Sequence, residues 1–128
     1  MCYMGNWGGF EFNNPYVGEP IETVNGIELP KQYLDFMREH NGGEGDIGEA
    51  WLVLFPLEEL EEINYDYEID KYLPGHIIIG SDGGDELYGV DENGQFFNVP
   101  VMIEAEYVTY FGTNIELLPD EINAFWSE

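Results

Sequence analysis

The stretch that decides the fold covers residues 76–91 and reads HIIIGSDGGDELYGVD. Its first part, His76–Gly80, is a short apolar run typical of a buried strand, and Glu86–Asp91 fits a neighbouring strand. The turn between them, Ser81–Asp85, contains two consecutive glycines, which permit a tight reversal of the chain. The sequence therefore predicts an antiparallel pair of strands at the centre of the molecule.

Further strands and a helix are expected on the C-terminal side of this pair. An Asn-Gly pair favours positive φ angles, so a turn should precede a third strand at Gln95–Val99. Residues 107–111 are either a fourth strand or an apolar connector. Thr113 and Glu116 have the spacing of a capping box, which predicts a final helical segment, interrupted or restarted at Pro119.

Two helices and one strand are expected on the N-terminal side. Residues 30–40 suit a helix, because proline favours the first helical position and Asn41-Gly42-Gly43 supplies a left-handed stop. Residues 51–55 are an apolar run of strand type, and Pro56 begins a second helix with apolar residues every three or four positions. Residues 1–20 are rich in glycine, proline and asparagine, so we expect them to be largely irregular.

Helices before and after a meander of antiparallel strands indicate an α+β domain. We expect a single domain over residues 1–128, because this length is usual for one hydrophobic core. Its antiparallel sheet should have about four to six strands flanked by a few helices. Helix and strand periodicity also predicts a set of buried residues, namely Tyr33, Phe36, Met37, Leu57, Leu60, Ile63, Ile77, Ile79, Leu87 and Val90.

The chain carries 27 acidic and three basic residues, which gives a formal net charge of −24. A protein that binds a phosphate backbone needs a patch of lysine and arginine, which Lys31, Arg38 and Lys71 alone cannot form. We therefore expect no nucleic acid and no membrane as a partner, and a basic protein surface as the natural complement. High solubility alone is the simpler interpretation of the same charge.

Cysteine content and hydropathy bear on the cellular location. Cys2 is the single cysteine, so no intramolecular disulfide can form. The sequence does not open on a basic segment followed by an apolar core, and no run approaches the roughly 18 apolar residues of a membrane helix. These features predict a cytoplasmic protein.

Motifs for catalysis and cofactor binding lack the context that their chemistry needs. Residues 43–48 match G-x-G-x-x-G, but they follow a helix and carry two acidic residues that would repel a pyrophosphate, so a glycine-rich connector is expected. Ser81 lacks the glycine two positions earlier that a nucleophile elbow needs. His40, His76 and Cys2 are far apart and have no metal-ligand spacing. We expect no catalysis, no metal and no cofactor.

Five short motifs occur in an order and spacing that together are specific. They are Leu29-Pro30-x-x-Tyr33-x-x-Phe36-Met37, Asn41-Gly42-Gly43-Glu44-Gly45, Phe55-Pro56-Leu57-Glu58-Glu59-Leu60 with Asn64-x-x-Tyr67, Leu73-Pro74, and Ile79-Gly80-Ser81-Asp82-Gly83-Gly84-x-x-Leu87-Tyr88-x-x-Asp91. The series resembles the SUKH superfamily, in particular its branch related to the yeast cell-wall-synthesis regulators. The resemblance runs from about Ile21 to Asn98, and more loosely to the final helix. It implies a SUKH-like α+β fold.

The resemblance also implies a binding module. Bacterial SUKH proteins resemble immunity proteins, which bind and neutralise a cognate polymorphic toxin domain encoded nearby, and many such toxins are nucleases. A nuclease presents a basic cleft to phosphates, and a protein of net charge −24 complements such a cleft. Fungal relatives act as regulatory interaction proteins, so a regulatory or scaffolding module without a toxin partner stays open as the alternative. A small hydrolase or calcium-dependent enzyme is a third class, supported only by the abundance of acidic residues.

The acidic residues also suggest where a partner would bind. Four glutamates within five residues repel one another on the outer face of the second helix, and a basic partner would relieve this repulsion. Tyr65 and Trp51 would supply aromatic anchors near this face. A solvated helix face is the simpler alternative. The expected partner-binding residues are Glu58, Glu59, Glu61, Glu62, Tyr65 and Asp66 on the helix, and Asp82, Asp85 and Glu86 in the turn.

Overall fold

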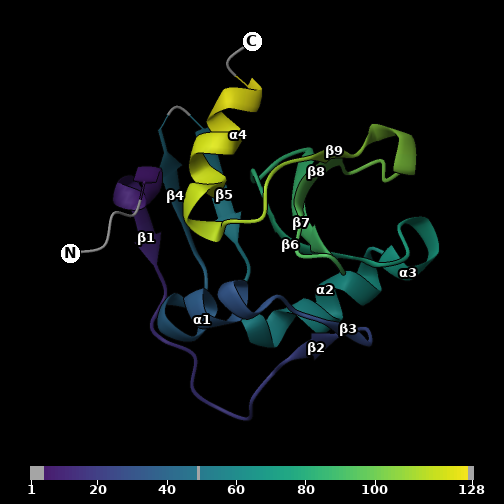
Figure 1. The fold of residues 1–128 in the computed structure, drawn as a ribbon, viewed down its shortest axis with the longest axis horizontal. Helices are drawn as coiled ribbons and strands as arrows, with labels where there is room; N and C mark the ends of the chain where they lie inside the picture. The colour runs from purple at the N-terminus through teal and green to yellow at the C-terminus, as the bar shows by residue number, and fades with distance from the viewer. Residues whose placement is uncertain (1–4, 49, 127–128) are drawn as a thin grey trace.

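The computed structural model describes residues 5–48 and 50–126, which form a seven-stranded antiparallel sheet with helices packed on it (Figure 1). The strand order is β1-β4-β5-β6-β7-β8-β9, and a small hairpin of β2 and β3 is separate from this sheet. The α+β class is confirmed. The sheet has seven strands, which is slightly more than the expected four to six. The elements are η1 (Gly5–Gly9, a 3-10 helix like the other η elements), β1 (Phe10–Phe12), β2 (Thr23–Val24), β3 (Ile27–Glu28), α1 (Lys31–His40), β4 (Gly43–Ile47), β5 (Ala50–Leu54), η2 (Leu57–Glu59), α2 (Leu60–Asp66), α3 (Ile69–Tyr72), β6 (His76–Ser81), β7 (Glu86–Asp91), β8 (Phe96–Pro100), η3 (Ala105–Tyr107), β9 (Thr109–Tyr110), η4 (Ile115–Leu117) and α4 (Leu118–Trp126).

The central pair predicted from residues 76–91 is present as β6 and β7. The register pairs His76 with Asp91 and Ser81 with Leu87, with a bulge between Ile78 and Gly80. β6 continues the sheet to β5 on one side, and β7 continues it to β8 on the other. The stretch that the sequence marked as decisive therefore occupies the middle of the sheet.

The sheet is covered on both faces, which explains the unbroken apolar run in β6. Ile77 and Ile79 belong to the larger core cluster, together with residues of α1 and α4, whereas Ile78 belongs to a smaller cluster with residues of α3. Successive side chains of a strand point to opposite faces, so a strand covered on both sides is apolar throughout. Nine of the ten residues expected to be buried are buried, and Ile63 is half-buried.

Asn41 ends α1, as predicted, and has a second role. Its φ of 48° lies in the left-handed region, which terminates the helix. Its side-chain Oδ1 accepts a hydrogen bond from the Leu57 N–H at 2.9 Å, and its Nδ2 donates to Glu58 Oε1 at 2.9 Å. One residue therefore ends α1 and also caps the start of η2, where the first N–H groups lack partners within the helix.

Residues 43–48 are not a glycine-rich connector, because residues 43–47 form β4. This strand pairs with β1 on one side and with β5 on the other. Gly43, Gly45 and Ile47 are buried and the acidic residues between them are exposed, so the strand does alternate. Two of its three inward positions have no side chain, and the alternation is therefore hidden from a hydrophobicity pattern.

The N-terminal segment contains more regular structure than expected. Residues 5–12 form η1 and β1, whereas residues 13–20 contain no helix or strand. β1 extends the sheet beyond β4, and Trp7 and Phe10 are buried in the larger core cluster. The β2–β3 hairpin was not expected either.

The C-terminal prediction needs one correction. The cap of the last helical segment is Asn114, whose Oδ1 accepts a hydrogen bond from the Glu116 N–H at 2.9 Å, and not Thr113. η4 then leads into α4, with Pro119 in the first turn, where proline is tolerated because the N–H that it lacks has no helical partner. In residues 107–111, β9 is only two residues long and pairs with β8, and the Phe111 N–H continues this contact by donating to the Phe96 carbonyl at 2.7 Å.

Candidate functional site

The outer side of η2 and α2 carries the first predicted binding surface. We call it the α2 face, and it consists of Glu58, Glu59, Glu61, Glu62, Tyr65 and Asp66, all of which are exposed. The opposite side of α2 is anchored by Leu60 and Asn64, which are fully buried. This division follows from the helical period, which places the apolar positions together and the acids outward.

Two glutamates of the α2 face already have partners within the chain. Glu58 accepts the hydrogen bond from Asn41 Nδ2, and the Glu61 carboxylate accepts from the Asn25 N–H at 3.0 and 3.3 Å. Among the residues that the structure describes, the side chains of Glu59 and Glu62 make no hydrogen bond or ion pair. The repulsion along this helix is therefore partly relieved internally, which the sequence did not reveal.

The second predicted surface is the turn between β6 and β7. Asp82 Oδ1 accepts hydrogen bonds from the N–H groups of Gly84 at 2.8 Å and Glu86 at 3.2 Å. Glu86 Oε1 accepts from Asn98 Nδ2 at 3.0 Å. Asp82 and Glu86 are half-buried and Asp85 is exposed, so two of the three carboxylates are fixed in position by the fold.

Trp51 lies at this turn and not at the α2 face, where it was expected. A depression of 470 Å³, which we call the tryptophan pocket, is lined by Ala50, Trp51, Asp82, Asp85, Glu86, Tyr88 and Trp126. The two indoles are 44% and 47% exposed. β5 positions Trp51 and the end of α4 positions Trp126, so segments far apart in sequence meet here.

Sequence reasoning missed Trp126 and Tyr88 as members of this site. Trp126 Nε1 donates a hydrogen bond to the Tyr88 hydroxyl at 2.8 Å, and Tyr88 itself is almost fully buried. Burial, supported by the charges of Asp82 and Glu86, raises the pKa of Tyr88 to about 12, so the phenol stays neutral near pH 7. The available signal for Trp126 was a tryptophan near the end of the predicted final helical segment.

The two acidic surfaces are on different parts of the molecule. α2 lies in the lower part of Figure 1, whereas α4, whose last residue is Trp126, lies at the top. Tyr65 is 79% exposed on the α2 face, and the tryptophan pocket has its own aromatic residues. A partner can thus contact either surface without the other.

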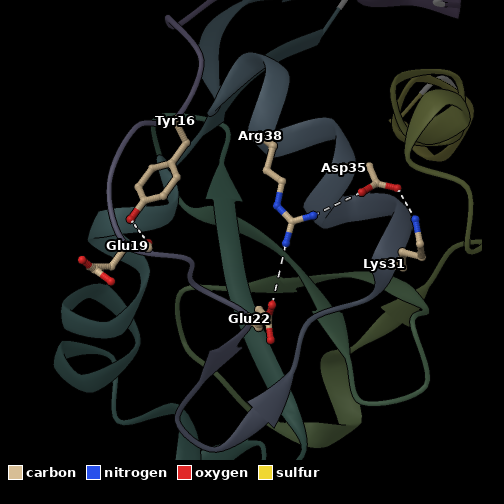
Figure 2. A network of polar contacts seen from close by, with 6 residues as sticks. All are labelled: Tyr16, Glu19, Glu22, Lys31, Asp35 and Arg38. Atoms are coloured by element: carbon tan, nitrogen blue, oxygen red, sulfur yellow. Dashed lines mark hydrogen bonds and ion pairs between the residues drawn. The ribbon is translucent and has the colours of Figure 1, made fainter.

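All three basic side chains are paired with acids of the same chain. Figure 2 shows Lys31 and Arg38 on either side of Asp35, with Nζ–Oδ2 at 2.8 Å and Nη1–Oδ1 at 3.5 Å, and Arg38 also 4.0 Å from Glu22. The hydrogen bond from Lys31 lowers the pKa of the Asp35 carboxyl. Lys71 is 3.9 Å from Glu68. These exposed pairs add little stability, but they neutralise the few positive charges of the surface.

The histidines have structural neighbours. The ring of His40 stacks on Phe12 with the centroids 4.1 Å apart. His76 Nε2 forms a hydrogen bond with the Tyr110 hydroxyl at 2.8 Å. Cys2 lies outside the described residues. Within those residues, no group of three His, Cys, Asp or Glu side chains is arranged to hold a metal ion, and none of the helices combines the length and hydropathy needed to span a bilayer.

Comparison with known proteins identifies the family. The model of the SMI1 / KNR4 family (SUKH-1) matches residues 19–124, which include every strand of the sheet except β1. No curated protein matched the chain. The family match covers most of the 128 residues, including all five motifs and both acidic surfaces. The chain therefore belongs to the SMI1 / KNR4 family (SUKH-1).

Proposed function

We propose that this protein is a non-catalytic immunity protein, which binds and neutralises a cognate polymorphic toxin domain through its acidic surface. The observation that carries the proposal is a SUKH-1 domain with a net charge of −24, in which all three basic side chains are paired internally. A basic protein is the partner that this surface favours, and a toxin with a nuclease cleft is such a protein.

The charge also suits the task of an inhibitor. Complementary charge raises the rate of association by one to three orders of magnitude over a neutral encounter, roughly 10 to 1,000-fold. A fast encounter matters because the inhibitor must reach the toxin before the toxin reaches its substrate. The same charge disfavours contact with nucleic acid, so the protein would not compete with the toxin for a phosphate backbone.

Within the α2 face, Glu59, Glu62 and Asp66 are the residues best placed to meet a partner. They are exposed, and unlike Glu58 and Glu61 they have no hydrogen bond to another part of the chain among the described residues. Their charges are free to pair with lysine or arginine of a second protein. Tyr65 adds an exposed aromatic ring beside them.

The test is to co-express the chain with the toxin domain encoded beside its gene and to measure growth and association kinetics. Wild-type protein should restore growth, and its association rate should fall steeply with salt. Changing Glu59, Glu62 and Asp66 together to lysine should lower the association rate about tenfold or more at low salt. The substitution spares Glu58 and Glu61, whose carboxylates accept hydrogen bonds from Asn41 and Asn25.

A matched control separates a local contact from a general effect of charge. Glu19, Glu39 and Glu116 are also exposed, and changing them to lysine alters the net charge by the same amount. An equal fall in rate for both triple variants would remove the α2 face from the proposal. Binding without protection of growth would overturn the immunity function and favour a regulatory interaction module instead.

A further inference from the structure

The tryptophan pocket combines two features, half-exposed aromatic rings and a concentration of acidic side chains. Trp51 and Trp126 leave nearly half of their surface in water, although large aromatic side chains gain most when buried. Three carboxylates, of Asp82, Asp85 and Glu86, line the same depression. Aromatic faces beside negative charge are the surroundings that favour an organic cation.

We propose that the tryptophan pocket receives one arginine side chain of the basic protein partner. The guanidinium would lie against the exposed indoles of Trp51 and Trp126, within reach of the carboxylates of the turn. The proposal rests on the proposed function for the source of the arginine, since the toxin is that partner, whereas the chemistry of the pocket stands independently of it.

Arginine fits this pocket better than lysine does. Its planar guanidinium stacks on aromatic faces, is weakly hydrated, and offers several N–H donors at once to neighbouring carboxylates. An ammonium group is compact and strongly hydrated, so it would have to give up more hydration to lie against an indole. A cation that must both stack on an indole and donate several hydrogen bonds to carboxylates is therefore best supplied by arginine.

Other occupants are disfavoured by charge. An anion or a nucleic acid would meet three carboxylates, and a purely apolar side chain would partly desolvate those carboxylates without bringing a positive charge beside them. A second copy of this chain brings a net charge of −24, and its three basic side chains already pair with its own acids. A separate basic protein is what remains.

The pocket is also held in shape before any ligand arrives. Asp82 is fixed by the N–H groups of Gly84 and Glu86, and Glu86 by Asn98 Nδ2. The Trp126 indole is fixed by its hydrogen bond to Tyr88. A ligand therefore has few groups to order on binding, which is the condition under which a small contact contributes most to affinity.

The first experiment uses the isolated protein and a single charged side chain. N-acetyl-arginine amide is titrated into ¹⁵N-labelled protein while the three indole N–H signals are followed by NMR. The Trp51 and Trp126 signals should shift together, with a dissociation constant of roughly 10–100 mM, as expected for a single side chain held by an aromatic contact and by charge. Trp7 is 1% exposed and donates to the Ile115 carbonyl, so its signal should stay fixed as an internal control.

Three comparisons sharpen this titration. N-acetyl-lysine amide should bind more weakly than the arginine compound. Changing Asp82 and Asp85 to asparagine and Glu86 to glutamine keeps their acceptor oxygens but should weaken arginine binding at least about tenfold. Neutralising Glu59, Glu62 and Asp66 in the same way removes equal charge from the α2 face and should leave the titration unchanged. Equal shifts of all three indoles, or equal loss in both triple variants, would overturn the proposal.

The second experiment uses the toxin domain. W51A should slow growth rescue and raise the dissociation rate, whereas Tyr107→Ala, which removes a comparably exposed aromatic ring elsewhere, should not. If wild-type protein does not bind the toxin but the pocket still binds N-acetyl-arginine amide, the proposed function fails and the site stands. If toxin binding is intact in W51A and W126F while the titration is negative, the site fails and the proposed function stands.

Discussion

At the scale of single residues, Asn64 supplies to β6 the hydrogen bonds that a neighbouring strand would otherwise make. Its Oδ1 accepts from the Ile78 N–H at 2.7 Å, and its Nδ2 donates to the Ile78 carbonyl at 3.0 Å and to the Leu60 carbonyl at 2.8 Å. The pairing of β5 with β6 covers only Ser81 and Gly80, so it does not reach Ile78. A side chain of α2 therefore replaces a strand at this point.

Replacement of Asn64 by leucine should destabilise the protein by about 2–4 kcal/mol, because it leaves the buried N–H and carbonyl of Ile78 without their hydrogen-bond partner. The free energy of unfolding in urea measures this change. Asn93 is exposed in a turn, and its replacement by alanine should change the stability by less than about 0.5 kcal/mol. A similar small loss at Asn64 would mean that water satisfies the Ile78 groups.

At the scale of elements, β4 depends on glycine where it faces β1. Gly45 has a φ of 151°, and a Cβ there would lie 2.9 Å from the Gly9 carbonyl oxygen, which is closer than real contacts allow. The close approach lets β1 pair with β4 and brings Trp7 and Phe10 over the core. Glycine is required at this position because a side chain would collide with β1, and not because the chain must be flexible there.

Replacement of Gly45 by alanine should therefore loosen β1 and cost about 2–4 kcal/mol of stability. Amide exchange of Asn13, whose N–H donates to the Gly42 carbonyl at 2.8 Å just beyond β1, should become faster together with the loss in urea stability. Glu44 is exposed in the same strand and its replacement by alanine serves as the control. Unchanged exchange at Asn13 in the Gly45 variant would show that β1 can shift to accommodate a Cβ with little loss of stability.

The same elements explain how far the sequence could predict the fold. β6 and β7 were predicted because both faces of each strand are buried, which leaves a continuous apolar signal around a glycine turn. β4 was missed because two of its inward residues are glycines, and β1 because three residues are too few for a pattern. Short-range signals thus identify elements with apolar side chains, and they fail where packing depends on the absence of a side chain.

The candidate site was predicted only in part, for a related reason. Acidic residues close in sequence suggested the α2 face and the turn directly. The tryptophan pocket could not be predicted, because Trp51, Trp126 and Tyr88 come from β5, α4 and β7 and meet only through the tertiary structure. Hydrogen bonds such as Asn41 to Glu58 and Asn25 to Glu61 also join distant segments, so the sequence overstated how many acids were free.

At the scale of the whole molecule, a net charge of −24 should make stability depend on salt. Self-repulsion of like charges opposes the compact state and is screened over about 10 Å at 0.1 M ionic strength. Raising NaCl from about 10 mM to about 300 mM should therefore raise the melting temperature by several degrees, roughly 4 °C or more.

Circular dichroism melts at pH 7 and near pH 4 provide the comparison. At the lower pH the carboxylates are partly protonated, so the repulsion and its dependence on salt should both be smaller. A melting temperature that does not respond to salt at pH 7 would show that the spacing of the charges already removes the repulsion.

The contact between η1 and η4 has a consequence for the order of events during synthesis. Trp7 Nε1 donates to the carbonyl of Ile115, which lies 108 positions later in the chain. A ribosome that adds roughly 5–20 residues per second needs about 5 to 20 s to make the intervening stretch. Through that interval the indole of Trp7 lacks its native acceptor, and the core that Trp7 shares with Ile115 cannot be completed. Each newly made molecule thus becomes fully folded only after Ile115 has left the exit tunnel, which sets the earliest moment at which it can act.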